Sequence, residues 1–413
     1  MNRLTLLSLM AAAPLVAGAA DTAPAWLVEP SLQTRVGFDT NPQGNSGTSA
    51  VVLGDEDTLT YTVGTSFGVL LSDATPDRPS LKFTYAVEAV RFDRWSSEDY
   101  TTHRFGWASK FAAGAWTFTG EGSSLLVAGS RDTVPSLTTL NGNAISIWRE
   151  RRRQWQDRVK LQAQVDLGAL IVRGTGTLLD YDYQTHLVAG KIAFADRSDA
   201  QGAFDLGWKQ TANSLWLAGM RAGHQSQGTI PLPNCAFDYS SDYYRLAAGW
   251  EGKPLAGTTV TFAAGPDFRH YTGVVDTRVF LYGRDRTSLW FDGGFASKLS
   301  PALTLTGKAG RTVWLSSTGK SAYLDSSVET ALAWTVTRAW TMRATAKVHR
   351  CDYLPTVRDD WESMYGAGAT LKYSDRTTFT FDALRHRGWN SVSGMPERTF
   401  QRLILNVGAG IRL

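Results

Sequence analysis

The densest charge in this chain is a short run of arginines with a tryptophan at each side, and it is the best candidate for binding a solute. The run comprises Arg149, Arg151, Arg152 and Arg153, between Trp148 and Trp155. Guanidinium groups bind carboxylates and phosphates through two parallel hydrogen bonds, and sugar rings can stack on indole. The run therefore predicts either a constriction that selects anionic solutes or a strand end whose arginines meet lipopolysaccharide phosphates.

The histidines and cysteines suggest no catalytic or metal site. The histidines are scattered, without the spacing of a metal motif or a nucleophile elbow, at His103, His186, His224, His270, His349 and His386. We expect no cofactor and no enzyme activity, with an outer-membrane hydrolase that uses a Ser/His or Asp/His pair as the alternative. Cys235 and Cys351 fall in predicted outer connections, where an exported chain either joins them in a disulfide or keeps two surface thiols.

The segments that must position these side chains alternate apolar and polar residues, with a period of two that predicts β-strands. In residues 57–71 the apolar positions are Leu59, Tyr61, Val63, Thr65, Phe67, Val69 and Leu71, and Thr58, Thr60, Thr62, Gly64, Ser66 and Gly68 lie between them. The same alternation fills residues 402–413. Successive side chains of a strand point to opposite faces, so each segment has one apolar and one small or polar face. Because the pattern recurs along nearly the whole chain, we predict that the apolar face meets lipid and the other encloses water.

Turn signals predict the number of strands. Short connections lie near residues 73–79, 112–115, 166–168, 211–213, 252–257, 300–302, 337–338 and 374–376. Longer ones lie near residues 41–57, 93–102, 128–150, 183–200, 224–240, 272–286, 315–322, 350–361 and 386–398. This rhythm predicts an all-β, transmembrane antiparallel barrel of about 18 strands (16–18), an even number typical of bacterial barrels. A soluble β-sandwich is the alternative, but it would have to bury charges such as Lys82 and Glu88.

Aromatic side chains mark one membrane interface. They lie close to the predicted short turns at Trp116, Trp208, Trp250, Trp334, Trp340, Tyr373 and Phe379. Rings of this kind gather at the level of the lipid headgroups, which supports the predicted register.

Once the apolar face of each strand is assigned to lipid, the alternation of side chains places the charged ones on the interior face. The basic ones are Arg35, Lys82, Arg104, Lys110, Arg158, Lys160, Lys209, Arg245, Lys298, Lys308, Arg343, Lys347, Lys372 and Arg412. The acidic ones are Asp39, Glu88, Glu121, Asp205, Glu251, Asp292, Glu329 and Asp382. A basic side chain facing lipid at the midplane costs about 2–4 kcal/mol, which disfavours the outward placement of so many. The sequence predicts a mildly cationic pore lining, or charges that only pair between neighbouring strands.

The chain begins like an exported protein. Arg3, the apolar run Leu4–Val16 and the small residues Ala17–Ala19 form a signal peptide, predicted at residues 1–20, with the barrel at residues 21–413. Little sequence separates the cleavage site from the first strand at residues 31–40, so we expect no plug domain. The formal net charge of +4 is too small and dispersed for nucleic-acid binding.

Three segments resemble a known family. Val36–Pro42, Leu179–Tyr183 and Arg402–Leu413 are similar to the outer-membrane β-barrel porins linked to exopolysaccharide gene clusters. Pro42 departs from the apolar residue expected there, and Leu413 stands where an aromatic residue usually signals barrel assembly. The resemblance implies an outer-membrane pore associated with polysaccharide export and supplies no catalytic residues.

The sequence thus predicts a passive pore in the outer membrane of a Gram-negative bacterium, with polysaccharide export as its leading role. A general diffusion porin with a mildly anion-favouring lumen is the first alternative, and a non-conducting structural or adhesin-like barrel is the second. The expected partners are outer-membrane lipid, lipopolysaccharide, the barrel-assembly machinery and periplasmic polysaccharide-export proteins.

Overall fold

The computed structural model describes most of the predicted barrel. It covers residues 26–41, 57–72, 80–129, 139–140, 143–144, 153–184, 195–228, 238–273, 284–316, 322–354, 358–390 and 400–413. The predicted signal peptide at residues 1–20 and the turn expected at 73–79 lie outside these ranges and stay predictions. None of the described helices is long and apolar enough to cross a membrane.

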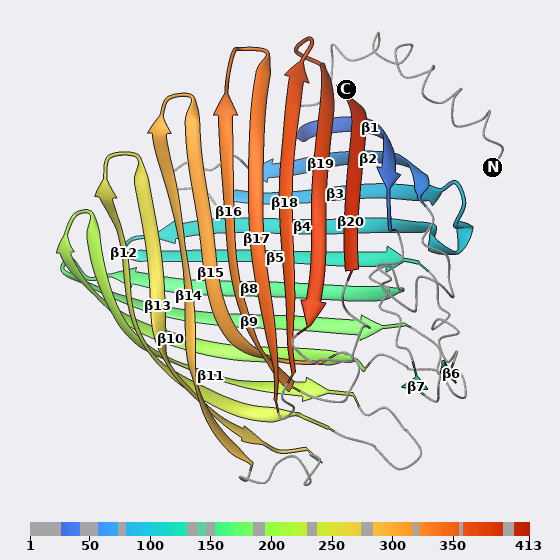
Figure 1. Cartoon of the computed structure of the whole chain (residues 1–413). Coiled ribbons are helices and arrows are strands. Elements are labelled where there is room, and N and C mark those ends of the chain that lie inside the picture. Colours follow the sequence, from blue (N-terminus) through green and yellow to red (C-terminus); the bar gives the residue numbers. More distant parts are fainter. Residues whose placement is uncertain are drawn as a thin grey trace.

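Eighteen antiparallel strands close into one barrel. They are β1 (Leu27–Asp39), β2 (Thr58–Ser72), β3 (Ser80–Phe92), β4 (Tyr100–Ala113), β5 (Trp116–Ala128), β8 (Gln154–Asp166), β9 (Leu170–Tyr183), β10 (Arg197–Thr211), β11 (Ser214–Gln227), β12 (Ser241–Leu255), β13 (Thr258–Tyr271), β14 (Asp285–Ser300), β15 (Leu303–Leu315), β16 (Ala322–Thr335), β17 (Trp340–Leu354), β18 (Arg358–Lys372), β19 (Thr377–Asn390) and β20 (Phe400–Arg412). Each pairs with its neighbours in sequence, and β20 pairs with β1. In Figure 1, β15–β20 cross β1–β9 steeply, as opposite walls of one barrel seen from the side.

Two minor elements lie outside the barrel wall. β6 (Thr139–Leu140) and β7 (Asn143–Ala144) pair only with each other, so β5 pairs directly with β8. In addition, the 3-10 turn η2 (Ser96–Glu98) follows β3. The predicted fold class and strand number are therefore confirmed.

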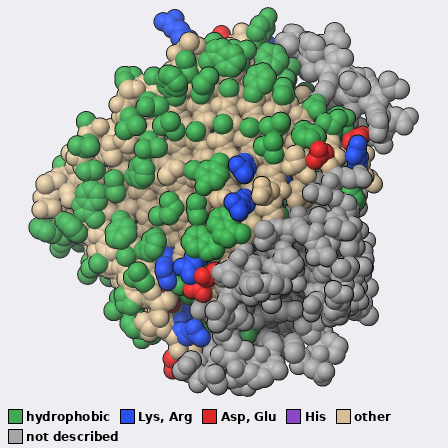
Figure 2. All heavy atoms as spheres, in the orientation of Figure 1, with side chains coloured by type: hydrophobic (Ala, Val, Ile, Leu, Met, Phe, Trp, Pro, Cys, Tyr) green, Lys and Arg blue, Asp and Glu red, His purple; other side chains and the backbone are tan. Residues whose placement is uncertain are grey.

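The two faces of the wall differ as the alternation predicts. On β2, Leu59 and Phe67 are exposed on the outside, whereas Thr60 and Thr62 are buried on the lumen side. Figure 2 shows apolar side chains spread over the visible outer surface, with most of its charged side chains near one end. A closed barrel leaves no unpaired sheet edge in hydrocarbon, and this exterior places the protein in the outer membrane of a Gram-negative bacterium.

The short turns lie at one end of the barrel, beside an aromatic belt. The strands connect there through only a few residues, for example between Ala113 and Trp116. Gly114 and Gly257 have φ angles of 58° and 76°, a left-handed conformation that glycine adopts without a steric penalty. Trp208 and Trp334, 53% and 48% exposed, belong to the belt that the sequence predicts at this end. Tyr373, in the turn after β18, is also exposed.

One predicted connection is much shorter than expected. Residues 350–361 were expected as an outer loop, but β17 runs to Leu354 and β18 begins at Arg358. Charge misled the prediction, because Arg350 and Asp359 stand on neighbouring strands and form an ion pair of 2.8 Å. Cys351 consequently lies within β17 and not in a loop.

The seam between the first and last strands contains a buried ion pair. Arg402 of β20 donates from Nε and Nη2 to the two carboxylate oxygens of Asp39 on β1, at 2.9 and 2.6 Å. Asp39 is only 2% exposed, and its carboxylate also accepts the backbone N–H of Asn41 at 3.1 Å. A bidentate pair of this kind fixes both register and orientation where the barrel closes.

We expect Asp39→Ala to destabilise the barrel by about 3–5 kcal/mol, because the largely buried Arg402 guanidinium loses this carboxylate. The midpoint of urea unfolding in detergent measures the change. Asp375→Ala is the control. Its carboxylate accepts a hydrogen bond from Lys372 in an exposed turn, which lowers the pKa of Asp375, and the midpoint should not move. Equal midpoints for both variants would refute the role of the seam pair.

Candidate functional site in the barrel lumen

Strand register puts the sequence-predicted charges of the wall on one face. Arg35 stands opposite Thr62 on the lumen side, and Glu88 stands opposite Gly64 of the same side. The same register places Lys82, Arg104, Lys110, Arg158, Lys160, Arg343 and Lys347 on this face.

Most of the predicted arginine run lies outside the described residues. Arg149, Arg151 and Arg152 are not among them, and their role as a constriction stays a prediction. Arg153 immediately precedes β8, and its Nε donates to Gln184 Oε1 at 2.8 Å. It therefore lies at the end of the barrel opposite the short turns.

The lumen charges divide into a paired and an unpaired group. Arg35 pairs with Glu88, and Arg343 pairs with Asp382 at 2.6 Å. No ion pair with another described residue holds Lys82, Arg104, Lys110, Arg158, Lys160, Lys298, Lys308 or Lys347. Among the described lumen-facing carboxylates, Glu121, Asp292 and Glu329 are likewise unpaired. The unpaired bases among the described lumen residues outnumber the unpaired acids, so the lumen has a surplus of cations.

Part of this surplus surrounds one cavity. The cavity has a volume of about 510 Å³ and is lined by Lys82, Glu121, Arg158 and Lys308 together with Thr84 and Ser123. Lys82, Glu121 and Arg158 come from β3, β5 and β8, whereas Lys308 comes from β15 in the opposite wall. Lys308 also lines a second cavity of about 310 Å³ beside Glu329. The two walls therefore approach each other here, around three cations and one carboxylate.

A second set of arginines was not predicted from the sequence, apart from Arg245. Arg197, Arg221, Arg245 and Arg269, here called the arginine cluster, lie on the lumen face of β10, β11, β12 and β13. A signal for them was present, because arginines recur every 24 residues from Arg173 to Arg269. One strand and its connection take about that length here, so equal spacing brings the guanidinium groups to neighbouring strands.

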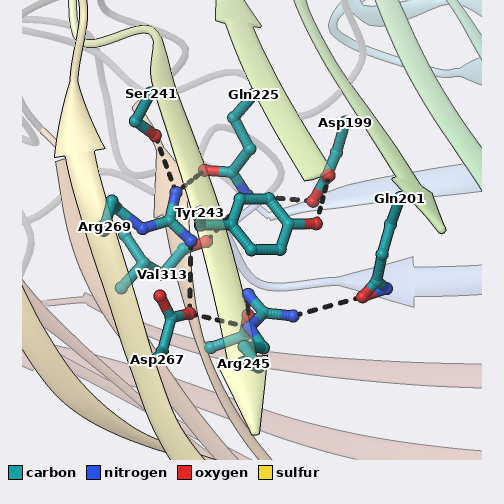
Figure 3. Close-up of polar contacts among 10 residues, drawn as sticks. Asp199, Gln201, Gln225, Ser241, Tyr243, Arg245, Asp267, Arg269 and Val313 are labelled. Atoms are coloured by element: carbon teal, nitrogen blue, oxygen red, sulfur yellow. Dashed lines mark hydrogen bonds and ion pairs between the residues drawn. The ribbon is translucent and has the colours of Figure 1, made fainter. Parts of the chain in front are cut away.

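Carboxylates and aromatic rings hold the arginine cluster, of which Figure 3 shows Arg245 and Arg269. Arg245 Nε and Arg269 Nη2 lie 2.7 and 3.3 Å from the same oxygen of Asp267. Both guanidinium groups also stack on the Tyr243 ring, at 4.3 and 4.6 Å from its centroid. Arg221 pairs with Asp205 at 2.8 Å. Charge compensation and cation–π contacts allow these arginines to be largely buried in the lumen.

Beside the arginine cluster, the last residues of strand β15 separate from β14. Its pairing with β14 begins at Leu303 and ends with Arg311 opposite Phe291. Pairing with β16 continues to Leu315 opposite Ala322. The part beyond Arg311, together with the start of β16, is here called the tip and comprises residues 312–316 and 322–324.

Polar side chains of the opposite strands bind the tip. Gln225 Nε2 donates to the carbonyl of Val313 at 3.0 Å, and Arg197 Nη1 donates to that of Leu315 at 2.6 Å. Gln227 Nε2 donates to the carbonyl of Ser316 at 2.7 Å, and Arg245 Nη2 to Thr312 Oγ1 at 3.0 Å. All four donors belong to lumen-facing positions, so the tip lies inside the barrel.

Apolar contacts complete the docking of the tip. Val313 and Leu315 are 2% and 1% exposed and form one buried cluster with Tyr271 of β13, Tyr239, Ala322 and Leu324. By strand parity Val313 and Leu315 belong to the lipid-facing row, yet here they pack against the inner wall. The tip therefore narrows the lumen toward the end opposite the short turns.

A Cys–His–Asp group on the lumen face lacks a catalytic arrangement. His349 Nε2 lies 2.6 Å from Asp325 Oδ1 and 3.6 Å from Cys351 Sγ. A relay needs the carboxylate and the nucleophile on different ring nitrogens, and here both lie nearest to Nε2, with Cys351 Sγ 4.0 Å from Nδ1. Among the described residues, no group of three or more His, Cys, Asp and Glu could hold a metal ion.

Comparison with known proteins gives structural neighbours only. No protein-family model matches the chain, and no curated protein sequence matches it. Pseudomonas aeruginosa OccK2 (OpdF), solved in complex with glucuronate, is 11% identical with a TM-score of 0.44, covering 93% of this chain and 98% of its own. The outer membrane protein OpdK of the same organism is 10% identical with a TM-score of 0.44, covering 93% and 99%. P. aeruginosa OpdO is 11% identical with a TM-score of 0.46, covering 94% of this chain and 99% of its own.

A likeness at this level does not identify the solute of this chain.

Thiol labelling tests the placement of Cys351. In a Cys235→Ser variant we expect N-ethylmaleimide to label Cys351 only after unfolding, because this side chain is 9% exposed within β17. Tyr373→Cys in a cysteine-free background is the control, since Tyr373 is 74% exposed and should be labelled in the folded protein.

The same assay tests the predicted disulfide between Cys235, which lies outside the described residues, and Cys351. In the unmodified sequence, unfolded without reductant, a disulfide leaves no thiol to label, and two labels per chain exclude it. Rapid labelling of folded Cys235→Ser protein would contradict the buried position of Cys351.

Proposed function

We propose that the chain is a passive outer-membrane pore that favours small anionic polar solutes and performs no catalysis. The observation that carries this proposal is the surplus of unpaired lumen cations, concentrated around the 510 Å³ cavity by Lys82, Arg158 and Lys308. A water-filled lumen with low-dielectric walls focuses the field of such charges and raises the local concentration of anions.

The chemistry of the cavity supports solutes with a carboxylate or phosphate and several hydroxyl groups. Three cations against Glu121 leave a formal net charge of about +2 among the described residues that line the cavity. The hydroxyls of Thr84 and Ser123 add neutral hydrogen-bonding groups. Cations from opposite walls can contact one bound anion from two sides, which favours a compact dianion over chloride.

Polysaccharide export is retained as a second proposal, because the family resemblance implies it. A polymer would need a wider passage than the present lumen, in which the tip occupies the mouth. Co-purification with periplasmic export proteins would favour export. A non-conducting surface barrel predicts instead that purified protein gives no conductance in planar bilayers.

Anion selection can be measured by reversal potential and by block with inorganic phosphate. We expect Lys82→Gln/Lys308→Gln to shift the reversal potential toward cations and to weaken phosphate block about tenfold or more, since two of three cations are lost. Glu121→Gln should strengthen the block, because it removes the one carboxylate among the described residues that line this cavity.

Lys372→Gln is the matched control, because Lys372 lies at the short-turn end and pairs with Asp375 at 2.6 Å. It should leave both quantities unchanged. An anion-selective pore whose selectivity survives Lys82→Gln/Lys308→Gln would place the selecting charges elsewhere, and a cation-selective parent pore would overturn the proposed solute class.

A further inference from the structure

We propose that the tip of β15–β16 is a gate, which exchanges its docked position in the lumen for pairing with the outer half of β14. The proposal goes beyond the proposed function, because anion selection at Lys82, Arg158 and Lys308 requires no moving part. It rests on the broken seam between β14 and β15, on the hydrogen bonds that hold the tip, and on the residues that face each other across the break.

The pairing between β14 and β15, which stops at Phe291 and Arg311, can continue toward the outer end without a change of register. We call the tip zipped when it is paired with β14 in this way, and docked when it lies in the lumen. The last pair is Phe291 opposite Arg311, so continued antiparallel pairing would set Trp290 opposite Thr312 and Leu289 opposite Val313. Thr287 would then stand opposite Leu315. The outer half of β14 keeps its pairing with β13 as far as Asp285, so it forms a prepared template for the tip.

The side chains of the tip suit both positions. In the docked position Val313 and Leu315 are buried against Tyr271. In the zipped position the same side chains would face lipid beside Leu289, which is already 55% exposed on the outer surface. Hydrophobic burial is therefore available in either state, and it does not strongly favour one of them.

The backbone of the tip also finds partners in both positions. Val313 and Leu315 are two residues apart, so their carbonyls point from the same edge of β15, the edge not used by β16. Gln225 and Arg197 supply the donors for these carbonyls in the docked position. Backbone N–H groups of β14 would supply them in the alternative position, so these two carbonyls would stay hydrogen-bonded. The start of β16 is paired with β17, Ala322 opposite Leu354 and Leu324 opposite Asp352, so the end of β17 would move with the tip.

The charge of Arg197 lowers the stability of the docked position. Arg197 forms no ion pair with a described residue. It binds the Leu315 carbonyl and the side chain of Tyr323, both in the tip, and lies 4.5 and 5.9 Å from the rings of Tyr181 and Trp314. A buried guanidinium without a carboxylate is costly, and opening would return it to water. Two states of similar free energy are what a gate requires.

Engineered disulfides distinguish the two positions. In a background of Cys235→Ser and Cys351→Ser, the pair Leu289→Cys/Val313→Cys can form a disulfide only when β14 and β15 are zipped, because directly opposed Cβ atoms lie about 4.5–5.5 Å apart. Ser297→Cys/Leu305→Cys, in the part of the seam that is already paired, is the control and should form a disulfide at all times.

We expect the 289–313 disulfide to form under mild oxidation and to lock a high-conductance state that reductant reverses. Failure of this disulfide where the 297–305 control forms would overturn the gate, as would a 289–313 disulfide that leaves the conductance unchanged. Gels of the folded protein report disulfide formation without any conductance measurement. Loss of pore activity in every variant would therefore count against the proposed function and not against the movement of the tip.

A second test, without cysteines, removes the two uncharged side chains that bind the tip, Gln225 and Gln227. Gln225→Ala/Gln227→Ala should raise the ratio of open to closed dwell times by about tenfold, because two hydrogen bonds to the docked tip are lost. Gln156→Ala/Gln162→Ala is the matched control, since these lumen-facing residues of β8 make no contact with the tip. Equal dwell-time ratios in the two variants would contradict the proposal.

Discussion

The rest of the structure depends on one constraint, the need to pair every backbone N–H and C=O group that lies in hydrocarbon. Pairing of β20 with β1 meets it by closing the sheet, and the Asp39–Arg402 ion pair fixes that seam. Closure then separates the side chains into two rows. Apolar side chains occupy the outer row, and the charges that the membrane would reject gather inside.

Among the described strands, the pairing of β14 with β15 stops well before the outer ends of both strands. There the backbone is satisfied by side chains, with Gln225 and Arg197 bonded to carbonyls of the tip. The carbonyls of Val313 and Leu315, which could extend the pairing with β14, thus hold the tip inside the lumen instead. The lumen has two layers as a result: the tip and arginine cluster toward one end, and the free cations around Lys82 and Lys308 nearer the short turns.

The alternation of apolar and polar residues was enough to predict the barrel, the strand number, the short turns and the lumen parity of Lys82 and Arg158. It failed at residues 350–361, where Arg350 and Asp359 look like loop residues but pair across two strands. The arginine cluster was largely missed, although its regular spacing is visible in the sequence. The docked tip could not be predicted, because Val313 and Leu315 show the same alternation whether they face lipid or pack inside the lumen.

The position of Lys308 has a consequence for biogenesis. Lys82 belongs to the third strand of the barrel and Lys308 to a strand more than two hundred residues later, yet both line one cavity. The filter therefore does not exist while the chain is still being inserted, because one half of it arrives only with the late strands. Under the proposed function, a barrel inserted without β15 would lack Lys308, so the order of strand insertion would determine when the anion site forms.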